Sequence, residues 1–114
     1  MADQQIINKI RCYIHLLNSE GFGISKAFLY GSFATGQNNE SSDIDLMLLS
    51  NTINESDIKK KSRAWVLTRK IDSRIEPYLI NLHRFESDNA SPLIEIVKNE
   101  GVEIDLSGTY SELS

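Results

Sequence analysis

The segment from Asp43 to Leu49 is the feature that most limits how this chain can fold. After its first three residues the segment is entirely apolar, which is typical of a strand buried on both faces. Such a strand needs other elements against each of its faces, because apolar side chains on either side must leave water. The segment therefore predicts a sheet with helices packed against it.

Helical patterns lie on both sides of this segment. Apolar residues spaced three and four apart predict an amphipathic helix over residues 4–18, and a longer helical pattern covers residues 55–73. Within the longer pattern we expect Trp65 to lie in the core. A short third helix is predicted to start with Ser91 as its N-cap and to end near Gly101.

Three further strands are predicted. Residues 24–30 are apolar and aromatic, residues 74–80 form a third strand, and residues 102–106 alternate as in a half-exposed strand. Pro77 cannot donate a ladder hydrogen bond, which favours an edge or a bulge for its strand. The expected fold class is α/β (α+β), a small mixed β-sheet with helices packed against it.

Composition excludes several classes of protein. With 114 residues the chain is predicted to form one domain, residues 1–106, followed by a polar tail, residues 107–114. The net charge of −4 argues against a DNA-coating protein and against stable nucleic-acid binding, although it does not exclude a local basic patch. The longest apolar run has four residues, so neither a membrane helix nor a signal peptide is expected. Cys12 is the single cysteine, which excludes an intrachain disulfide and leaves a cytoplasmic protein as the expectation.

Two short motifs carry the predicted chemistry. Gly31 and Ser32 follow a strand and precede a turn into a helix, where free backbone N–H groups and the Ser32 hydroxyl can hold a phosphate. Asp43 and Asp45 are two residues apart on a predicted strand, so their carboxylates leave the same face. Paired carboxylates repel unless a cation lies between them, and their hard oxygens suit Mg²⁺. A phosphate cradle with paired acids is the equipment of metal-assisted nucleotidyl transfer.

A third acid would complete this site, and Glu76 is the best candidate because a neighbouring strand could bring it beside the aspartates. Its role would be that of a metal ligand or a general base. Asp72 is the alternative, although it falls near the end of the long helix. Arg74 shares a strand face with Glu76 and is a weaker candidate for binding a triphosphate.

A basic run precedes the Glu76 strand. Seven of the 12 basic residues fall between Lys59 and Arg74. A solvated helix face explains such a run most simply, while the sharper interpretation is a surface that meets an acidic partner. On the second interpretation, Lys60 and Arg63 contribute to a docking surface that borders the active site.

Taken singly, each of these motifs is common in turns and at strand ends, so their order is what carries the prediction. Gly31-Ser32, ten residues, then Asp43-Ile44-Asp45 resembles the signature of the minimal nucleotidyltransferases, small members of the DNA polymerase β-like superfamily. The neighbouring Phe-Ala-Thr-Gly and Ser-Ser-Asp-Ile-Asp-Leu also resemble that family. Arg74-Ile75-Glu76-Pro77 is similar to its third-carboxylate strand, and the resemblance spans about residues 5–106.

The resemblance implies a polymerase β-like nucleotidyltransferase fold in which Asp43, Asp45 and Glu76 are catalytic and hold Mg²⁺, with two ions expected. It implies ATP as the substrate, bound at Gly31 and Ser32. Small members of the family are often antitoxins that transfer AMP to a tyrosine of a helical HEPN-type toxin, and such a toxin is the expected partner. Two alternatives stay open: a catalytically silent binding antitoxin, and a nucleotidyltransferase acting on a small molecule such as an aminoglycoside. The oligomeric state and the identity of the partner are left open.

Overall fold

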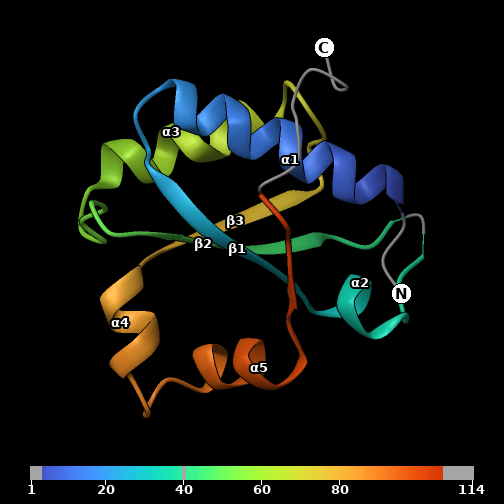
Figure 1. Ribbon diagram of the computed structural model, residues 1–114. Helices are drawn as coiled ribbons and strands as arrows, with labels where there is room; N and C mark the ends of the chain where they lie inside the picture. The colour runs from blue at the N-terminus through green and yellow to red at the C-terminus, as the bar shows by residue number, and fades with distance from the viewer. Residues whose placement is uncertain (1–3, 40, 107–114) are drawn as a thin grey trace.

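A four-stranded mixed sheet forms the centre of the protein, as the sequence predicts (Figure 1). The structure is a computed structural model and describes residues 4–39 and 41–106. The strands are β1 (Ile24–Tyr30), β2 (Ile44–Ser50), β3 (Ile75–Asn81) and β4 (Val102–Glu103), and their order in the sheet is β3-β2-β1-β4. β1 runs antiparallel to β2 and β4, whereas β2 and β3 are parallel.

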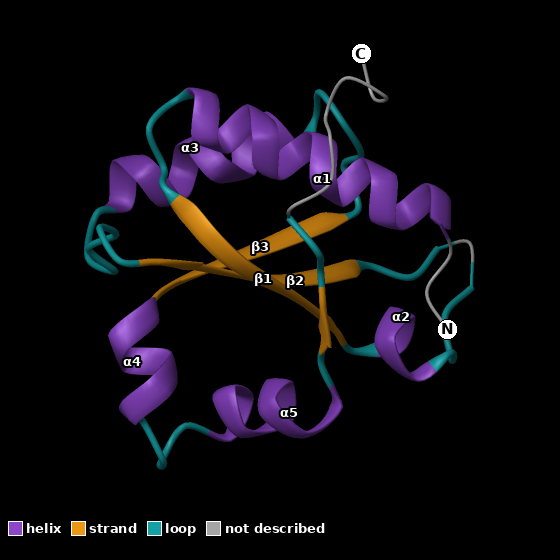
Figure 2. Ribbon diagram, viewed as in Figure 1, coloured by secondary structure: helices purple, strands orange, loops and turns teal. Residues whose placement is uncertain are grey.

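Helices cover both faces of the sheet. α1 (Gln4–Ser19) and α3 (Ile58–Thr68) lie on one face, and α4 (Leu82–Ser87) and α5 (Pro92–Glu100) lie on the other (Figure 2). The one-turn helix α2 (Ser32–Thr35) follows β1 at one end of the sheet. None of the helices in the described part of the chain has the length and apolarity that crossing a bilayer requires.

β2 lies between two hydrophobic cores, which confirms the expected burial on both of its faces. Leu46 and Leu48 belong to the larger core under α1 and α3, and Met47 and Leu49 belong to the smaller core under α4 and α5. Asp45 shares the side of Met47 and Leu49, because successive side chains alternate between the faces of a strand. The carboxylate of Asp45 is therefore on the face of the sheet that carries α4 and α5.

The turn after α1 and the contact between α1 and α3 are both fixed by polar groups. The Asn18 side chain accepts a hydrogen bond from the backbone N–H of Ile24 at 2.7 Å and donates one to the carbonyl of the same residue. The buried Tyr13 hydroxyl donates to the carbonyl of Ala64 at 2.6 Å. Burial raises the pKa of Tyr13 above its ordinary value, so the phenol stays a neutral donor.

The long helix is shorter than the sequence predicts. It starts at Ile58 because the Asp57 side chain caps it by accepting from the N–H of Lys60. It ends at Thr68, where the backbone changes to tighter bonds such as that from the Arg69 N–H to the Val66 carbonyl. The expectation that Trp65 is a core residue is wrong, since its exposed fraction is 48%. α3 is amphipathic, but Trp65 lies outside its buried stripe.

α4 was not predicted, and β4 is shorter than predicted. The Asn81 side chain caps α4 by accepting from the N–H of His83, and Phe85 stacks on Phe28 of β1 with ring centroids 5.2 Å apart. α4 has only six residues and two apolar side chains, Leu82 and Phe85, which is too short a stretch for a helical period to be recognised. β4 keeps two of the five expected residues, while the predicted tail lies outside the described residues.

Candidate active site

Three carboxyl groups come together where β2 and β3 begin. The parallel register of the two strands sets Asp45 beside Glu76. Asp43 lies one residue before β2, and its carboxyl group is within hydrogen-bonding reach of that of Glu76. The structure thus brings together the three acids that the sequence singled out.

The proximity of these acids changes their protonation. The hydrogen bond with Asp43, then burial, and then the charges of Asp43 and Asp45 raise the pKa of Glu76 to about 7. Burial, followed by the charge of Asp43, also raises the pKa of Asp45 above its ordinary value. Three acids held this closely repel one another, so a proton or a cation shared among them stabilises the cluster.

Gly31 lets the turn after β1 approach the acids closely. Tyr30 is the antiparallel partner of Asp45, and the next residue, Gly31, has φ 72° and ψ −149°, a conformation that only glycine adopts readily. A Cβ atom at this position would collide with the Asp45 carboxylate. Ser32 follows as the first residue of α2, so its hydroxyl belongs to the turn that packs on Asp45.

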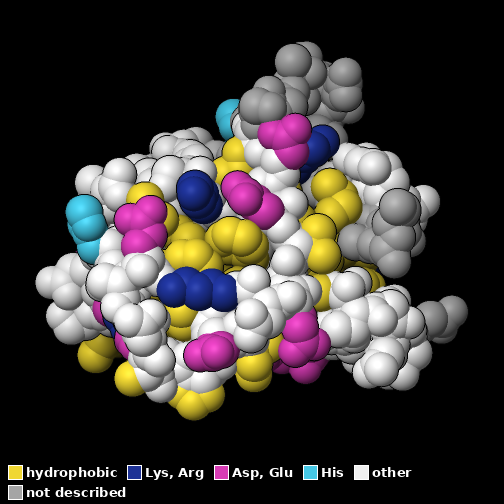
Figure 3. Space-filling model, turned by 60° about the horizontal axis from the view of Figure 1, so that its bottom comes forward, with side chains coloured by type: hydrophobic (Ala, Val, Ile, Leu, Met, Phe, Trp, Pro, Cys, Tyr) yellow, Lys and Arg dark blue, Asp and Glu magenta, His cyan; other side chains and the backbone are white. Residues whose placement is uncertain are grey.

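Two tyrosines border the acid cluster, and neither was among the site residues predicted from the sequence. Burial, and then the charges of Asp45, Tyr78 and Glu76, raise the pKa of Tyr30 to about 12. Tyr78 follows Glu76 by two residues on β3, which puts both side chains on the same face of the sheet, and its exposed fraction is 41%. The spacing of two residues between Glu76 and Tyr78 on a predicted strand was the sequence signal that could have identified Tyr78. Acidic and hydrophobic side chains lie next to one another on the side of the molecule that carries α4 and α5 (Figure 3).

Arg74 precedes β3 and lies beside α2. Its guanidinium stands over the ring of Phe33 at 5.9 Å from the centroid. Both residues line a cavity of about 320 Å³ whose wall also includes Gln5, Ile6, Lys9, Asn38 and Asn39. Arg74 is therefore near the Gly31–Ser32 turn, but its guanidinium already pairs with Asp72 at 2.8 Å.

Asp72, the alternative third acid, has a structural role. Its carboxylate accepts hydrogen bonds from Lys9 at 3.0 Å and from the side chain and backbone N–H of Arg74. These contacts, led by the Arg74 side chain, hold the pKa of Asp72 well below its ordinary value. Asp72 thus joins α1 to the start of β3 and is not among the groups that raise the pKa values of Asp45 and Glu76.

We expect Asp72→Asn to lower the free energy of unfolding at pH 7 by about 1–2 kcal/mol, because charge-assisted hydrogen bonds to two partly exposed cations are lost. A folded-state pKa below the unfolded one adds stability that is present above the unfolded pKa and lost as pH falls. The difference from wild type should therefore be constant above about pH 5 and shrink below about pH 4. Urea unfolding across this pH range measures it.

Glu86→Gln is the matched control, since the exposed Glu86 carboxylate has no described partner. A pH-independent loss in Asp72→Asn, or an equal loss in the control, would contradict the assigned role of Asp72.

Comparison with known proteins assigns the family. The family model described as "Polymerase beta, Nucleotidyltransferase" matches residues 12–105, which is most of the chain. This chain is a member of the polymerase beta nucleotidyltransferase family. The membership agrees with the mixed sheet and with the resemblance carried by Gly31-Ser32 and Asp43-Ile44-Asp45. No curated protein matches the sequence of this nucleotidyltransferase.

Solved structures share its fold. A toxin–antitoxin structure with AMP-PNP aligns with 22% identity and a TM-score of 0.58, covering 90% of this chain and 76% of the other. A mutant form of the toxin–antitoxin MntA-HpeT aligns with 24% identity and a TM-score of 0.57, covering 93% and 76%. A candidate nucleotidyltransferase from Sulfolobus solfataricus aligns with 15% identity and a TM-score of 0.56, covering 90% and 87%. Because these identities are all below 25%, the likeness shows a shared fold and nothing beyond it.

The acid cluster of this nucleotidyltransferase is chemically suited to Mg²⁺, which one or two of its carboxylates would bind. In residues 4–39 and 41–106, no three acidic, histidine or cysteine side chains form a ready-made metal-binding group. Mg²⁺ needs no such group, because it usually takes one or two protein carboxylates and completes its shell with water and substrate phosphates. Asp43, Asp45 and Glu76 supply oxygens of this kind, and their mutual repulsion favours a cation between them.

Two cations of the basic run, Lys60 and Arg63, contact the turn that follows α1. The Arg63 guanidinium pairs with Glu20 at 2.8 Å, while the Lys60 ammonium donates to the Gly21 carbonyl at 3.0 Å and lies over the ring of Phe22. Both cations therefore help to attach α3 to the turn after α1. This structural use counts against Lys60 and Arg63 as docking residues.

Proposed function

We propose that this nucleotidyltransferase moves AMP from ATP to a hydroxyl group of a partner protein, a tyrosine of a HEPN-type toxin, and so acts as its antitoxin. The observation that carries the proposal is the parallel pairing of β2 with β3, which brings Asp43, Asp45 and Glu76 together beside the Gly31–Ser32 turn. Acids gathered beside a tight glycine turn suit a reaction at phosphorus, where negative charge must be held and neutralised.

The proposed step forms a bond between the acceptor oxygen and the α-phosphorus of ATP and breaks the bond from that phosphorus to the bridging oxygen, so pyrophosphate leaves. Bound Mg²⁺ would neutralise the developing charge on the phosphates. The hydroxyl proton passes to a carboxylate. We assign this transfer to Glu76, because the strand register sets its carboxylate beside Asp45, next to where the phosphates would be neutralised.

The Gly31–Ser32 turn is proposed to hold the phosphates. The N–H groups of Ala34 and Thr35 donate to the Gly31 carbonyl. The N–H groups of Ser32 and Phe33 precede these bonds, so they have no acceptor within this helical turn. The Ser32 hydroxyl makes no hydrogen bond with the other residues that the structure describes. These donors are suited to phosphate oxygens.

The neighbouring toxin–antitoxin structures support the choice of nucleotide and partner. One of them contains AMP-PNP, an ATP analogue, and another is a mutant in which two aspartates two residues apart are changed to glutamate. The spacing of those aspartates equals that of Asp43 and Asp45. Tyr78, which is exposed and shares the face of Glu76, leaves room for a protein acceptor.

The test of this function is transfer itself. We expect the pure protein, given Mg²⁺ and ATP labelled at the α-phosphate, to label a toxin encoded beside its gene, and the mass of that toxin to rise by one AMP unit per modified tyrosine. A Tyr→Phe toxin variant and an ATP analogue that cannot release pyrophosphate are the controls. Inhibition of the toxin without labelling would instead indicate a silent binding antitoxin, and labelling of aminoglycosides alone would indicate a small-molecule enzyme.

A further inference from the structure

One side of α3 exposes a line of alternating apolar and basic side chains. Ile58, Lys61, Trp65 and Arg69 are spaced by three, four and four residues, which places them on one face of the helix. Ile58 is 75% exposed and Trp65 is 48% exposed. The buried face of α3, which includes Ala64 and Leu67, packs into the larger core on another side of the helix. Large apolar side chains gathered on one exposed face are typical of a protein-binding site.

The two cations of this line have no acidic partner in the described part of the chain. Lys61 and Arg69 make no ion pair there, in contrast to Arg63, which is paired with Glu20. The nearby acid Glu55 is also occupied, because it pairs with Arg84 of α4. The exposed line thus carries positive charge that an acidic partner could neutralise.

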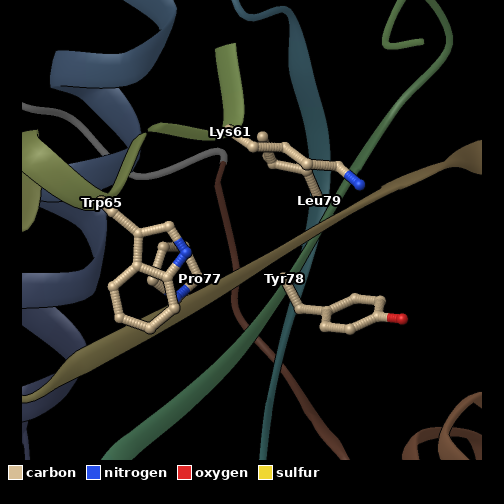
Figure 4. A pocket seen from close by; sticks show the side chains of 5 residues that line it. All are labelled: Lys61, Trp65, Pro77, Tyr78 and Leu79. Atoms are coloured by element: carbon tan, nitrogen blue, oxygen red, sulfur yellow. The ribbon is translucent and has the colours of Figure 1, made fainter. Parts of the chain in front are cut away.

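A cavity joins this line to β3. It has a volume of about 260 Å³ and is lined by Lys61, Trp65, Pro77, Tyr78 and Leu79. In Figure 4 the Trp65 ring lies over Pro77, Lys61 extends over Leu79, and the Tyr78 ring points away from Trp65. We call Ile58, Lys61, Trp65, Arg69 and Tyr78 the β3-edge surface, because three of them line this cavity at the edge strand β3 and the other two, Ile58 and Arg69, continue the same side of α3 and its C-cap.

The free edge of β3 is poorly suited to adding a strand. The Ile44 N–H donates to the Arg74 carbonyl, so alternation directs the backbone of Ile75, Pro77, Leu79 and Asn81 away from β2. The Ile75 N–H donates to the Asp72 carbonyl, Pro77 has no N–H, and the Asn81 N–H donates to Glu55. Only the N–H of Leu79 is left on this edge, which is too few for a strand ladder.

We propose that the β3-edge surface binds an amphipathic helix of a partner protein, one whose apolar contact residues are flanked by carboxylates. Because strand addition is disfavoured, side chains must supply the binding energy, and Trp65 and Tyr78 are of the types that most often do so. The carboxylates of the helix would pair with Lys61 and Arg69. The proposal rests on the proposed function, in which a protein presents the acceptor hydroxyl.

Tyr78 connects the β3-edge surface to the face of the sheet that holds the acid cluster. Tyr78 lies two positions after Glu76 on the same face of β3, a distance of about 7 Å along the strand. The α3 residues of the surface lie on the other face, so a protein whose helix is held at the cavity would reach the acids around the free edge of β3. This continuity gives the surface a role in presenting an acceptor.

RNA is the main competing occupant, since lysine, arginine and aromatic residues also bind single strands. Phosphate binding depends on many neutralised charges, however, and this chain has a net charge of −4. The β3-edge surface offers two cations against three large apolar residues. The balance favours a protein.

The experiment uses fluorescein-labelled probes, with anisotropy as the readout and no ATP or Mg²⁺ present. The first probe is a synthetic helix of about 20 residues with a leucine stripe flanked by glutamates. The second probe replaces the glutamates by lysines, and the third is a single-stranded RNA. Lys61→Glu and Trp65→Ala test the surface. Lys59→Glu is the matched control, because it makes the same charge change about half a helical turn away from Lys61.

We expect the acidic helix to bind, Lys61→Glu and Trp65→Ala to weaken it about tenfold or more, and Lys59→Glu to stay within about twofold of wild type. The lysine-flanked helix should bind more weakly than the acidic one. Failure of the acidic helix to bind, tighter binding of the RNA at the same surface, or an equal loss in Lys59→Glu would overturn the proposal. Concentration-dependent dimerisation that Trp65→Ala abolishes would also overturn it, in favour of a second copy of this chain.

Failure of the proposed function gives a different pattern. If the acidic helix binds as expected but no toxin is labelled with AMP, the β3-edge surface stands and the proposed transfer is wrong. If a toxin is labelled normally by Lys61→Glu and Trp65→Ala, transfer stands and the docking proposal is wrong.

Discussion

Asp45→Asn is expected to reduce nucleotidyl transfer by on the order of 10³-fold or more while the protein remains folded. Asparagine keeps the shape of the side chain but removes the negative charge that would hold Mg²⁺ beside the phosphates. Burial and the charge of Asp43 already raise the pKa of Asp45, so the neutral side chain relieves a repulsion. The metal-free variant should therefore unfold at the same temperature as wild type or at a higher one.

Labelled-ATP transfer measures the activity, and thermal unfolding with and without Mg²⁺ measures the stability. Wild type should gain stability from Mg²⁺ with nucleotide, and Asp45→Asn should lose most of that gain. Asp43→Asn is expected to behave in the same way, whereas Glu86→Gln removes an exposed acid elsewhere and should change neither quantity. Normal transfer by either aspartate variant, or unfolding of both, would contradict the metal-site interpretation.

Gly31→Ala should combine a loss of stability with a loss of transfer. Its backbone has φ 72° and ψ −149°, where a side chain is strained, and the added Cβ would collide with the Asp45 carboxylate. We expect a cost of about 2–4 kcal/mol in the free energy of unfolding, from backbone strain and the displaced carboxylate together. Moving Asp45 or the turn also separates the acids from the proposed phosphate site.

Gly36→Ala is the matched control for this variant. Gly36 also has a positive φ, 77°, but a Cβ there would meet no atom within 4 Å. Its cost should be only that of the left-handed backbone, about 1–2 kcal/mol, with transfer nearly unchanged. Denaturant unfolding and transfer assays on both variants separate the two causes. Equal effects of the two substitutions would mean that the contact between Gly31 and Asp45 has no special importance.

The local pattern of the chain determined most of the secondary structure. The apolar run after Asp45 required burial on both faces, and β2 does lie between two cores. Pro77 predicted an edge or a bulge, and β3 is one of the two edge strands of the sheet. Ser91 predicted the start of α5. Each of these predictions depends on a property of one residue or of its near neighbours, and such properties act before the chain is folded.

The sequence also identified the acids of the candidate site, because the spacing of Asp43 and Asp45 on one strand is a local property. The position of Glu76 depends instead on a register between two strands that are about thirty residues apart in the chain. Hydrophobic pattern alone does not determine that register. The tertiary structure decided it, and with it the closeness of the Asp43 and Glu76 carboxyl groups.

Tertiary packing likewise decided the exposure of α3 and the roles of the charged residues near it. Trp65 was expected in the core from its type, but the helix turns another face, with Ala64 and Leu67, toward the sheet. Asp72 and Arg74 were both site candidates by sequence, and the structure pairs them with each other. Sequence spacing determines which side chains share a face, whereas only the packing of one element on another decides which face is buried and which charges meet.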